Sequence, residues 1–87
     1  MQPTYRLETI LNHSGATMKL HALIADLRWR VQLLASDIHE EEKRTGIFDV
    51  SNVAYPILAR NLRARRNNLL ATITVLEKQL AEIDVAA

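Results

Sequence analysis

The sequence predicts an all-α protein, an antiparallel two-helix coiled-coil hairpin that dimerises into a four-helix bundle. Two apolar series of similar length, each advancing by alternate steps of four and three residues, lie on either side of a short polar segment. Such steps keep a residue on one seam of a helix wound at about 3.5 residues per turn. Two glycines and two prolines in 87 residues are too few for a turn-rich β protein. The first series is Leu20, Ile24, Leu27, Val31, Leu34 and Ile38, and the second is Tyr55, Ala59, Leu62, Arg66, Leu69, Ile73, Leu76, Leu80 and Ile83.

The hairpin is expected to span residues 17–87, with helices at 17–44 and 55–84 and a loop at 45–54. Gly46 suits the left-handed position that follows a helix end, and Pro56 suits the first turn of the second helix. Residues 1–16 are expected to form a leader, either a short helix or a disordered segment, because residues 12–15 should break the helix. Met18 is an alternative start of the chain.

Equal arms joined by a short link place the helices side by side and antiparallel. A fold centred near residue 50 pairs Leu27 with Ile73 and Leu20 with Leu80, and it sets Leu34 against the layer of Arg66. Ile47 and Phe48 should then plug the end of the hairpin. The same register brings the acidic end of the first helix close to the arginines of the second.

Four arginines lie within two turns at the start of the second helix: Arg60, Arg63, Arg65 and Arg66. They could form ion pairs with the acidic residues of the first helix, bind a protein partner, or hold the phosphates of a nucleic acid. The register places Asp37 near Arg63 and Glu40 near Arg60, with Glu41 and Glu42 close by, so pairing is the favoured interpretation. Aromatic side chains that could stack on bases do not alternate with these arginines, so we do not expect nucleic acid as the main partner. Arg66 lies on the seam and would fix the register or face a partner.

A second apolar surface lies on the first helix, on the side away from the seam. Its residues are Trp29, Leu33, Ala22 and Ala25. A helix with two apolar stripes packs against two neighbours, and large aromatic residues often anchor contact surfaces. A core of this size seldom contributes more than about 3–5 kcal/mol. We therefore expect self-association through this surface, with cover by residues 5–11 or exposure to solvent as the alternatives.

Several function classes are disfavoured by the composition. The formal charge of +1 does not indicate a nucleic-acid-binding protein, and the absence of cysteine excludes disulfides. No phosphate-binding loop, nucleophile motif or zinc motif is present, so we expect no catalytic residues, no cofactor and no metal. His39 and Glu42 alone are too few ligands for a metal site. No apolar run approaches the roughly 20 residues of a membrane span, and residues 1–6 lack the apolar core of a signal peptide, so a cytoplasmic protein is expected.

Most of the chain, roughly residues 23–80, resembles the FliJ-like flagellar export proteins. The motif Glu-Glu-x-Arg-Thr-Gly carries the resemblance together with Ala-Tyr-Pro and Arg-Arg-x-Asn-Leu at matching offsets. The chain is shorter than typical members, so it resembles a short variant or paralogue. The matching residues are 23–26, Asp37 and Ile38, 40–47, Asp49, 54–56, Ala59, 65–70 and Ile73.

The resemblance implies a non-enzymatic adaptor of the flagellar type III export apparatus or a related assembly. Such proteins are antiparallel helical hairpins that are thought to contact the export ATPase or the export gate. The partner surface would then be Arg60, Arg63, Arg65 and Arg66. The alternative is a small helical nucleic-acid-binding or regulatory protein that uses the same arginines, and a small helical enzyme is a more distant third possibility.

Overall fold

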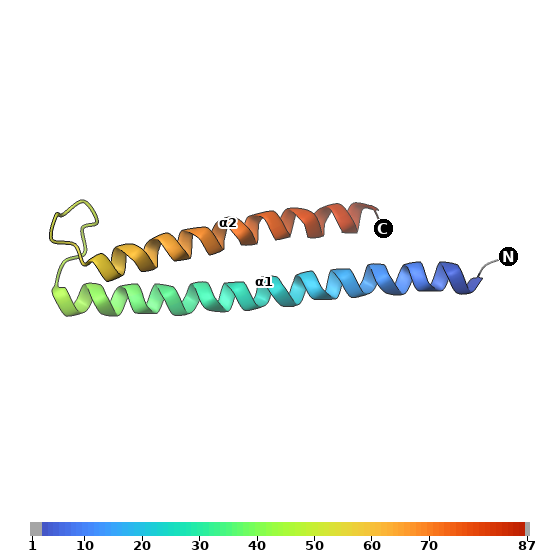
Figure 1. Cartoon of the computed structure of the whole chain (residues 1–87), viewed down its shortest axis with the longest axis horizontal. Coiled ribbons are helices and arrows are strands. Elements are labelled where there is room, and N and C mark those ends of the chain that lie inside the picture. The colour runs from blue at the N-terminus through green and yellow to red at the C-terminus, as the bar shows by residue number, and fades with distance from the viewer. Residues whose placement is uncertain (1–2, 87) are drawn as a thin grey trace.

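The chain folds into two long helices that lie side by side and antiparallel. The structure, a computed structural model, describes the backbone of residues 3–86 and the side chains of residues 15–83. Helix α1 (Pro3–Thr45) and helix α2 (Ile57–Ala86) are joined by a loop at residues 46–56, and no strand occurs within residues 3–86. The rod that they form measures 69 × 17 × 14 Å (Figure 1). The predicted all-α helical hairpin is confirmed.

The predicted break at residues 12–15 is absent, because α1 runs without interruption from Pro3 to Thr45. A leader separated from the hairpin is therefore wrong for residues 3–16, while Met1 and Gln2 lie outside the described residues. A single glycine inside a helix costs about 1 kcal/mol relative to alanine. No proline lies between Pro3 and Pro56, so Gly15 alone is too weak a signal to end a helix of 43 residues.

The C-terminal end of α1 is capped as the sequence predicts. Gly46 has a φ of 73°, and its N–H donates to the carbonyl oxygen of Glu42 at 2.8 Å. This geometry is the left-handed cap that glycine adopts without steric cost. The Thr45 hydroxyl adds contacts at 3.2 Å to the carbonyl oxygens of Glu41 and Glu42, so these two carbonyls have donors within the helix end.

The loop is built from two consecutive turns, each stabilised by its own side chain. The carboxylate of Asp49 accepts hydrogen bonds from the Ser51 N–H at 2.9 Å and from the Ser51 hydroxyl at 2.7 Å. The side-chain oxygen of Asn52 accepts from the Ala54 N–H at 2.8 Å. Aspartate and asparagine favour turns for this reason, since their side chains replace a backbone acceptor. Polar groups inside the loop are therefore used to hold its shape.

Helix α2 begins after Pro56, two residues later than predicted, so Tyr55 belongs to the loop. A residue before proline is pushed toward an extended backbone, which keeps Tyr55 out of the helix. The Pro56 carbonyl accepts the first helical hydrogen bond, from the Arg60 N–H at 3.0 Å. The position of Tyr55 outside the helix matters for the site described below.

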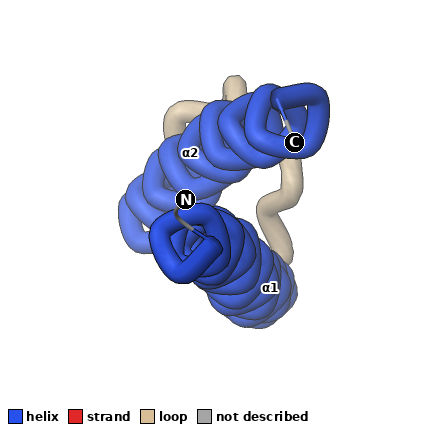
Figure 2. Tube along the Cα trace, turned by 90° about the vertical axis from the view of Figure 1, so that its right-hand side faces the viewer, coloured by secondary structure: helices blue, strands red, loops and turns tan. Residues whose placement is uncertain are grey.

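The two helices pack along the predicted seam and cross as they run along the rod (Figure 2). Ile24, Leu27 and Ile73 form a buried cluster, so the predicted neighbours Leu27 and Ile73 do lie together. Half-buried Val31, Leu69, Leu76 and Leu80 pack against this cluster. Arg28 and Glu77 form an exposed ion pair between the helices at the edge of the seam.

Candidate functional site

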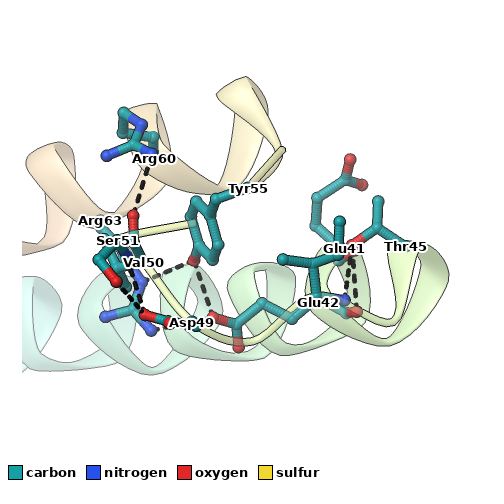
Figure 3. Close-up of polar contacts among 10 residues, drawn as sticks. Glu41, Glu42, Thr45, Asp49, Val50, Ser51, Tyr55, Arg60 and Arg63 are labelled. Atoms are coloured by element: carbon teal, nitrogen blue, oxygen red, sulfur yellow. Dashed lines mark hydrogen bonds and ion pairs between the residues drawn. The ribbon is translucent and has the colours of Figure 1, made fainter. Parts of the chain in front are cut away.

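The most elaborate part of the molecule is the closed end of the hairpin, residues 42–63, which we call the tip. Tyr55 is 3% exposed and reaches from the loop toward α1 (Figure 3). Ala59, with no exposed surface, and Ile38, with 3%, are buried at the same end of the hairpin. The small side chain of Ala59 allows α2 to approach α1 closely there.

A closed ring of hydrogen bonds joins three side chains within the tip. The Tyr55 hydroxyl donates to Oε2 of Glu42 at 2.7 Å and accepts from Nε of Arg63 at 2.7 Å. Nη2 of Arg63 donates to the same Glu42 oxygen at 2.9 Å. The ring therefore ties the last turn of α1, the end of the loop and the second turn of α2 together (Figure 3).

Glu42 is 7% exposed, and this ring explains how its charge is tolerated there. Burial of an unpaired carboxylate is costly, whereas a carboxylate with a cation and a hydroxyl donor is compensated. The hydrogen bond from Arg63, followed by that from Tyr55, holds the pKa of Glu42 below its ordinary value. The Tyr55 hydroxyl and the Glu42 carboxylate raise the pKa of Arg63 in turn. Both side chains are therefore charged at neutral pH.

Arg60 fastens the loop to α2. Its guanidinium carbon lies 5.3 Å from the centre of the Tyr55 ring, and its Nη2 donates to the Val50 carbonyl oxygen at 3.1 Å. The guanidinium of Arg63 also lies near this ring, at 5.7 Å. Cations within about 6 Å of an aromatic face are attracted to it. The loop is thus held from both of its ends.

The side chains that the loop does not use for its own structure are largely apolar. Ile47 is half-buried, as expected for a residue that plugs the hairpin end, but Phe48 is 53% exposed and does not share that role. A rigid loop that displays several large apolar side chains is unusual, because scattered rather than clustered apolar residues are the norm on a soluble surface. The exposed set comprises Phe48, Val50 and Val53 of the loop, together with Ile57 and Leu58 of the adjoining first turn of α2.

The four arginines of the predicted partner patch have different environments. Arg63 pairs with Glu42 rather than with Asp37, and Arg60 contacts Val50 and Tyr55 rather than Glu40, so these two predicted pairings are wrong. Arg65 is exposed. Arg66 is half-buried on the seam, and its Nε atom is buried without a hydrogen-bond partner. Arg60 and Arg63 therefore stabilise the fold of the tip, Arg65 is exposed and accessible to a partner, and Arg66 belongs to the seam.

Sequence reasoning missed the ring because it treated Tyr55 as an apolar seam residue and Glu42 as one of several exposed acids. The signal available was a tyrosine on a seam otherwise filled by aliphatic residues. A buried tyrosine needs a partner for its hydroxyl. Glu41, the neighbour of Glu42, instead forms an ion pair with Arg44 on its own helix, and that pair lowers the pKa of Glu41.

The predicted self-association residues lie on the far side of α1 from the seam. Trp29 is 62% exposed and Leu33 is 47% exposed, and Ala22 and Ala25 are exposed as well. Met18, also exposed, continues the same stripe toward the N-terminus. We call these five residues the outer face. The alternative cover, residues 5–11, lies within the helix itself and involves side chains outside the described set.

Comparison of the chain with protein-family models, with curated proteins and with solved structures finds no match. Among the side chains of residues 15–83, no three histidine, aspartate or glutamate residues gather so that they could hold a metal ion. Within residues 3–86, neither helix has an apolar stretch of bilayer-spanning length. The geometry of the tip and of the outer face therefore carries the functional argument.

Proposed function

We propose that this protein is a non-enzymatic helical adaptor whose tip binds a protein partner. The observation that supports this function is the rigid loop, which presents large apolar side chains beside Arg60, an arginine that lacks a carboxylate partner among the described side chains. The ion pairs of this region involve Arg44 and Arg63 instead, and Arg65, five residues further along α2, is exposed.

Rigidity at a contact surface favours binding. A loop that is already ordered loses little conformational entropy when a partner docks, so more of the contact energy appears as affinity. The turns at Asp49 and Asn52 and the ring at Tyr55 supply that order. Exposed apolar residues with arginine among them are also the composition found at the centres of protein interfaces.

The assembly proposed for this adaptor is the flagellar type III export apparatus or a related one, and it rests on the sequence motifs described above. The motif residues from Glu40 to Ile47 and from Ala54 to Pro56 lie in or beside the tip. A partner that recognises these motifs would therefore bind at the tip. The export ATPase and the cytoplasmic part of the export gate are the two partners to test.

The experiment measures binding of the purified chain to each of these two proteins from the same organism by biolayer interferometry. Val53→Asp places a charge on a fully exposed loop side chain and should weaken binding at least tenfold without unfolding the chain. Val75→Asp, on an exposed position of α2 away from the tip, is the matched control and should leave Kd nearly unchanged. Equal Kd values for the wild type and Val53→Asp would exclude the tip, and no binding to either protein would exclude this assembly.

The second class, a nucleic-acid-binding protein, uses the same arginines and is tested in the same way. Binding through phosphate contacts weakens steeply between about 50 and 200 mM salt, because counterions are released. Binding through an apolar tip changes little over that range. Oligonucleotide affinity with a steep salt dependence, abolished by Arg65→Glu and not by Val53→Asp, would replace the adaptor proposal.

A further inference from the structure

The outer face of α1 is left uncovered by the hairpin. Its five residues, Met18, Ala22, Ala25, Trp29 and Leu33, advance by steps of four, three, four and four. Leu27 and Ile38, by contrast, are buried in the seam on the opposite side of the same helix. A helix with two apolar faces is expected to have two packing partners, and α2 supplies only one.

The surface area of the chain leaves room for a second partner. The hairpin exposes 6573 Å², whereas a compact monomer of 9.9 kDa is expected to expose about 5,200 Å². The excess of roughly 1,400 Å² is larger than the roughly 800 Å² that each partner buries in a stable interface of ordinary size. Covering one face of that size would therefore remove a little more than half of the excess.

The charges along one edge of the outer face identify what covers it. Lys19, Asp26, Arg30 and Asp37 are all exposed, and steps of seven, four and seven residues keep them on that edge. Asp26 and Arg30 already form an ion pair at 3.0 Å within the helix. The charges alternate in sign along the helix, positive first from the N-terminal side and negative first from the C-terminal side. A copy of this series running in the opposite direction therefore places an opposite charge at each position.

An antiparallel copy of α1 satisfies these four charges together. A two-fold axis at residue 28 lies midway between Lys19 and Asp37 and midway between Asp26 and Arg30. In an antiparallel pair of helices, like edges meet, so each cation faces a carboxylate of the other copy. In a parallel pair this edge would meet the opposite edge of the outer face of the other copy. Among the described residues between 15 and 45, that opposite edge carries no carboxylate that could pair with Lys19 or Arg30.

The sizes of the apolar side chains favour the same arrangement. Trp29 and Ala25 are centred on residue 27, and Leu33 and Ala22 on residue 27.5. Both centres lie within one residue of the axis set by the charges, so Trp29 of one copy lies near Ala25 of the other, and Leu33 lies near Ala22. Large residues opposite small ones fill an interface evenly. A parallel pair would instead stack alanine on alanine and tryptophan on tryptophan, which leaves gaps at one layer and crowds another.

We propose that a second copy of this chain covers the outer face, with the two α1 helices antiparallel about a two-fold axis near residue 28. Because the outer face lies opposite the seam, the dimer sets its four helices side by side in the order α2, α1, α1, α2, and it carries its two tips at opposite ends. Gly46 lies 18 residues from the axis, so the tips are about 54 Å apart at 1.5 Å per residue. The protein is therefore a two-ended adaptor that can join two partner molecules, and this goes beyond the binding proposed for a single tip.

Single cysteines distinguish the possible arrangements, because the natural chain has none. Ala22→Cys and Leu33→Cys chains are purified separately, mixed and oxidised. The antiparallel pair brings positions 22 and 33 of different copies together, so a disulfide should form between the two variants and neither should cross-link to itself. Ala71→Cys, exposed on α2, is the control and should cross-link to neither. Cross-linking of each variant to itself would show a parallel pair, and no cross-linking would overturn the interface.

Light scattering measures the same proposal without cross-links. The wild type should have the mass of two chains at micromolar concentration, and Trp29→Ala should weaken the dimer at least about a hundredfold while helicity is kept, since two hot-spot side chains are lost. Leu70→Ala, at a similarly exposed position on α2, should leave the mass unchanged. A wild-type chain that stays single at 100 μM, or a fully dimeric Trp29→Ala variant, overturns the proposal.

Charge exchange tests the direction of the pair. Lys19→Asp should weaken the dimer a few-fold, and adding Asp37→Lys to the same chain should restore it, because each pairing occurs twice in the antiparallel dimer. Failure of the second change to rescue the first would contradict the register. The dimer and the tip can fail separately, since Val53→Asp affects partner binding and should leave the mass of the dimer intact.

Discussion

The tip and the central seam hold the same two helices together by different physical means. The seam buries aliphatic side chains around Leu27 and Ile73, and its attraction depends on apolar area rather than on direction. The tip buries a charged carboxylate and satisfies it with hydrogen bonds from Tyr55 and Arg63. Hydrogen bonds of this kind tolerate little displacement in distance or angle.

Because of this difference, the stability of the hairpin and the register of its two helices depend on different regions. An apolar seam with a seven-residue period can slide by one period and still bury similar side chains. The ring at Glu42 cannot, because a slide would leave its carboxylate buried without donors. The seam therefore contributes most of the free energy of folding, and the tip selects one alignment of the two helices.

The largest expected effect comes from the seam. Ile73→Ala removes a side chain that is 3% exposed at the centre of the buried cluster and should lower the free energy of unfolding by about 2–5 kcal/mol. Urea denaturation followed by circular dichroism measures it. Val75→Ala, two residues away and 55% exposed, should change stability by less than about 0.5 kcal/mol. Equal losses in the two variants would show that the seam lies on a different face of α2.

A smaller loss is expected at the tip. Tyr55→Phe keeps the buried aromatic group and removes the hydroxyl, so Glu42 loses a hydrogen-bond donor and Arg63 loses an acceptor. Hydrogen bonds to charged groups typically contribute about 1.5–3 kcal/mol, and a loss of that order is expected in thermal unfolding. In a double-mutant cycle with Glu42→Gln, the two losses should not add, because both changes break the same ring. Additive losses would mean that Tyr55 and Glu42 act independently.

Arg66 should respond in the opposite direction. Its Nε atom is buried without a hydrogen-bond partner in the seam, so Arg66→Leu removes an uncompensated polar group and adds apolar contact. We expect Tm to rise, with a gain of about 1 kcal/mol, while Arg65→Leu at an exposed position changes little. A lower Tm for Arg66→Leu would show that the head of Arg66 is stabilised by solvent or by a carboxylate.

The smallest effect is the dependence of stability on acid. The pKa of Glu42 is lower in the folded chain than its ordinary value of 4.5, mainly because of Arg63. Its contribution is therefore complete above pH 4.5 and is lost as the pH falls through the lowered value. Tm measured from pH 7 to pH 2 should fall on the acid side, and Glu42→Gln should flatten this fall in part, since Glu41 and Asp49 also have lowered pKa values. An unchanged acid slope in Glu42→Gln would contradict the ring.

The sequence predicted the features that follow from local rules. The seam follows from the spacing of apolar residues, and the cap at Gly46 follows from the conformation that glycine prefers after a helix end. The continuity of α1 through Gly15 was not predicted, because one local breaker is outweighed by the helix around it. The helix propensity of a single residue is a weak predictor inside a long helix, because the neighbouring turns stabilise the residue in the helical conformation.

The ring was not predictable for a different reason. The acidic residue that pairs with Arg63 is set by the rotation of α2 about its own axis. The conformation of the eleven loop residues 46–56 determines that rotation, and the spacing of apolar residues does not predict it. The register alone placed Asp37 opposite Arg63, yet the loop brings Glu42 there instead. Pro56 contributes to this outcome, because it keeps Tyr55 out of the helix and leaves its side chain free to reach Glu42.

The ring at the tip also has a consequence for how the chain folds. Its three members lie within 22 residues of one another, so they meet after the closure of a short loop, which takes well under a microsecond. The contacts of Leu80 with the cluster that contains Ile24 and Leu27 close a far longer span and lose more chain entropy. Folding should therefore begin at Glu42, Tyr55 and Arg63, and the remaining turns of α1 and α2 should zip together outward from that nucleus, as the low contact order of a hairpin allows.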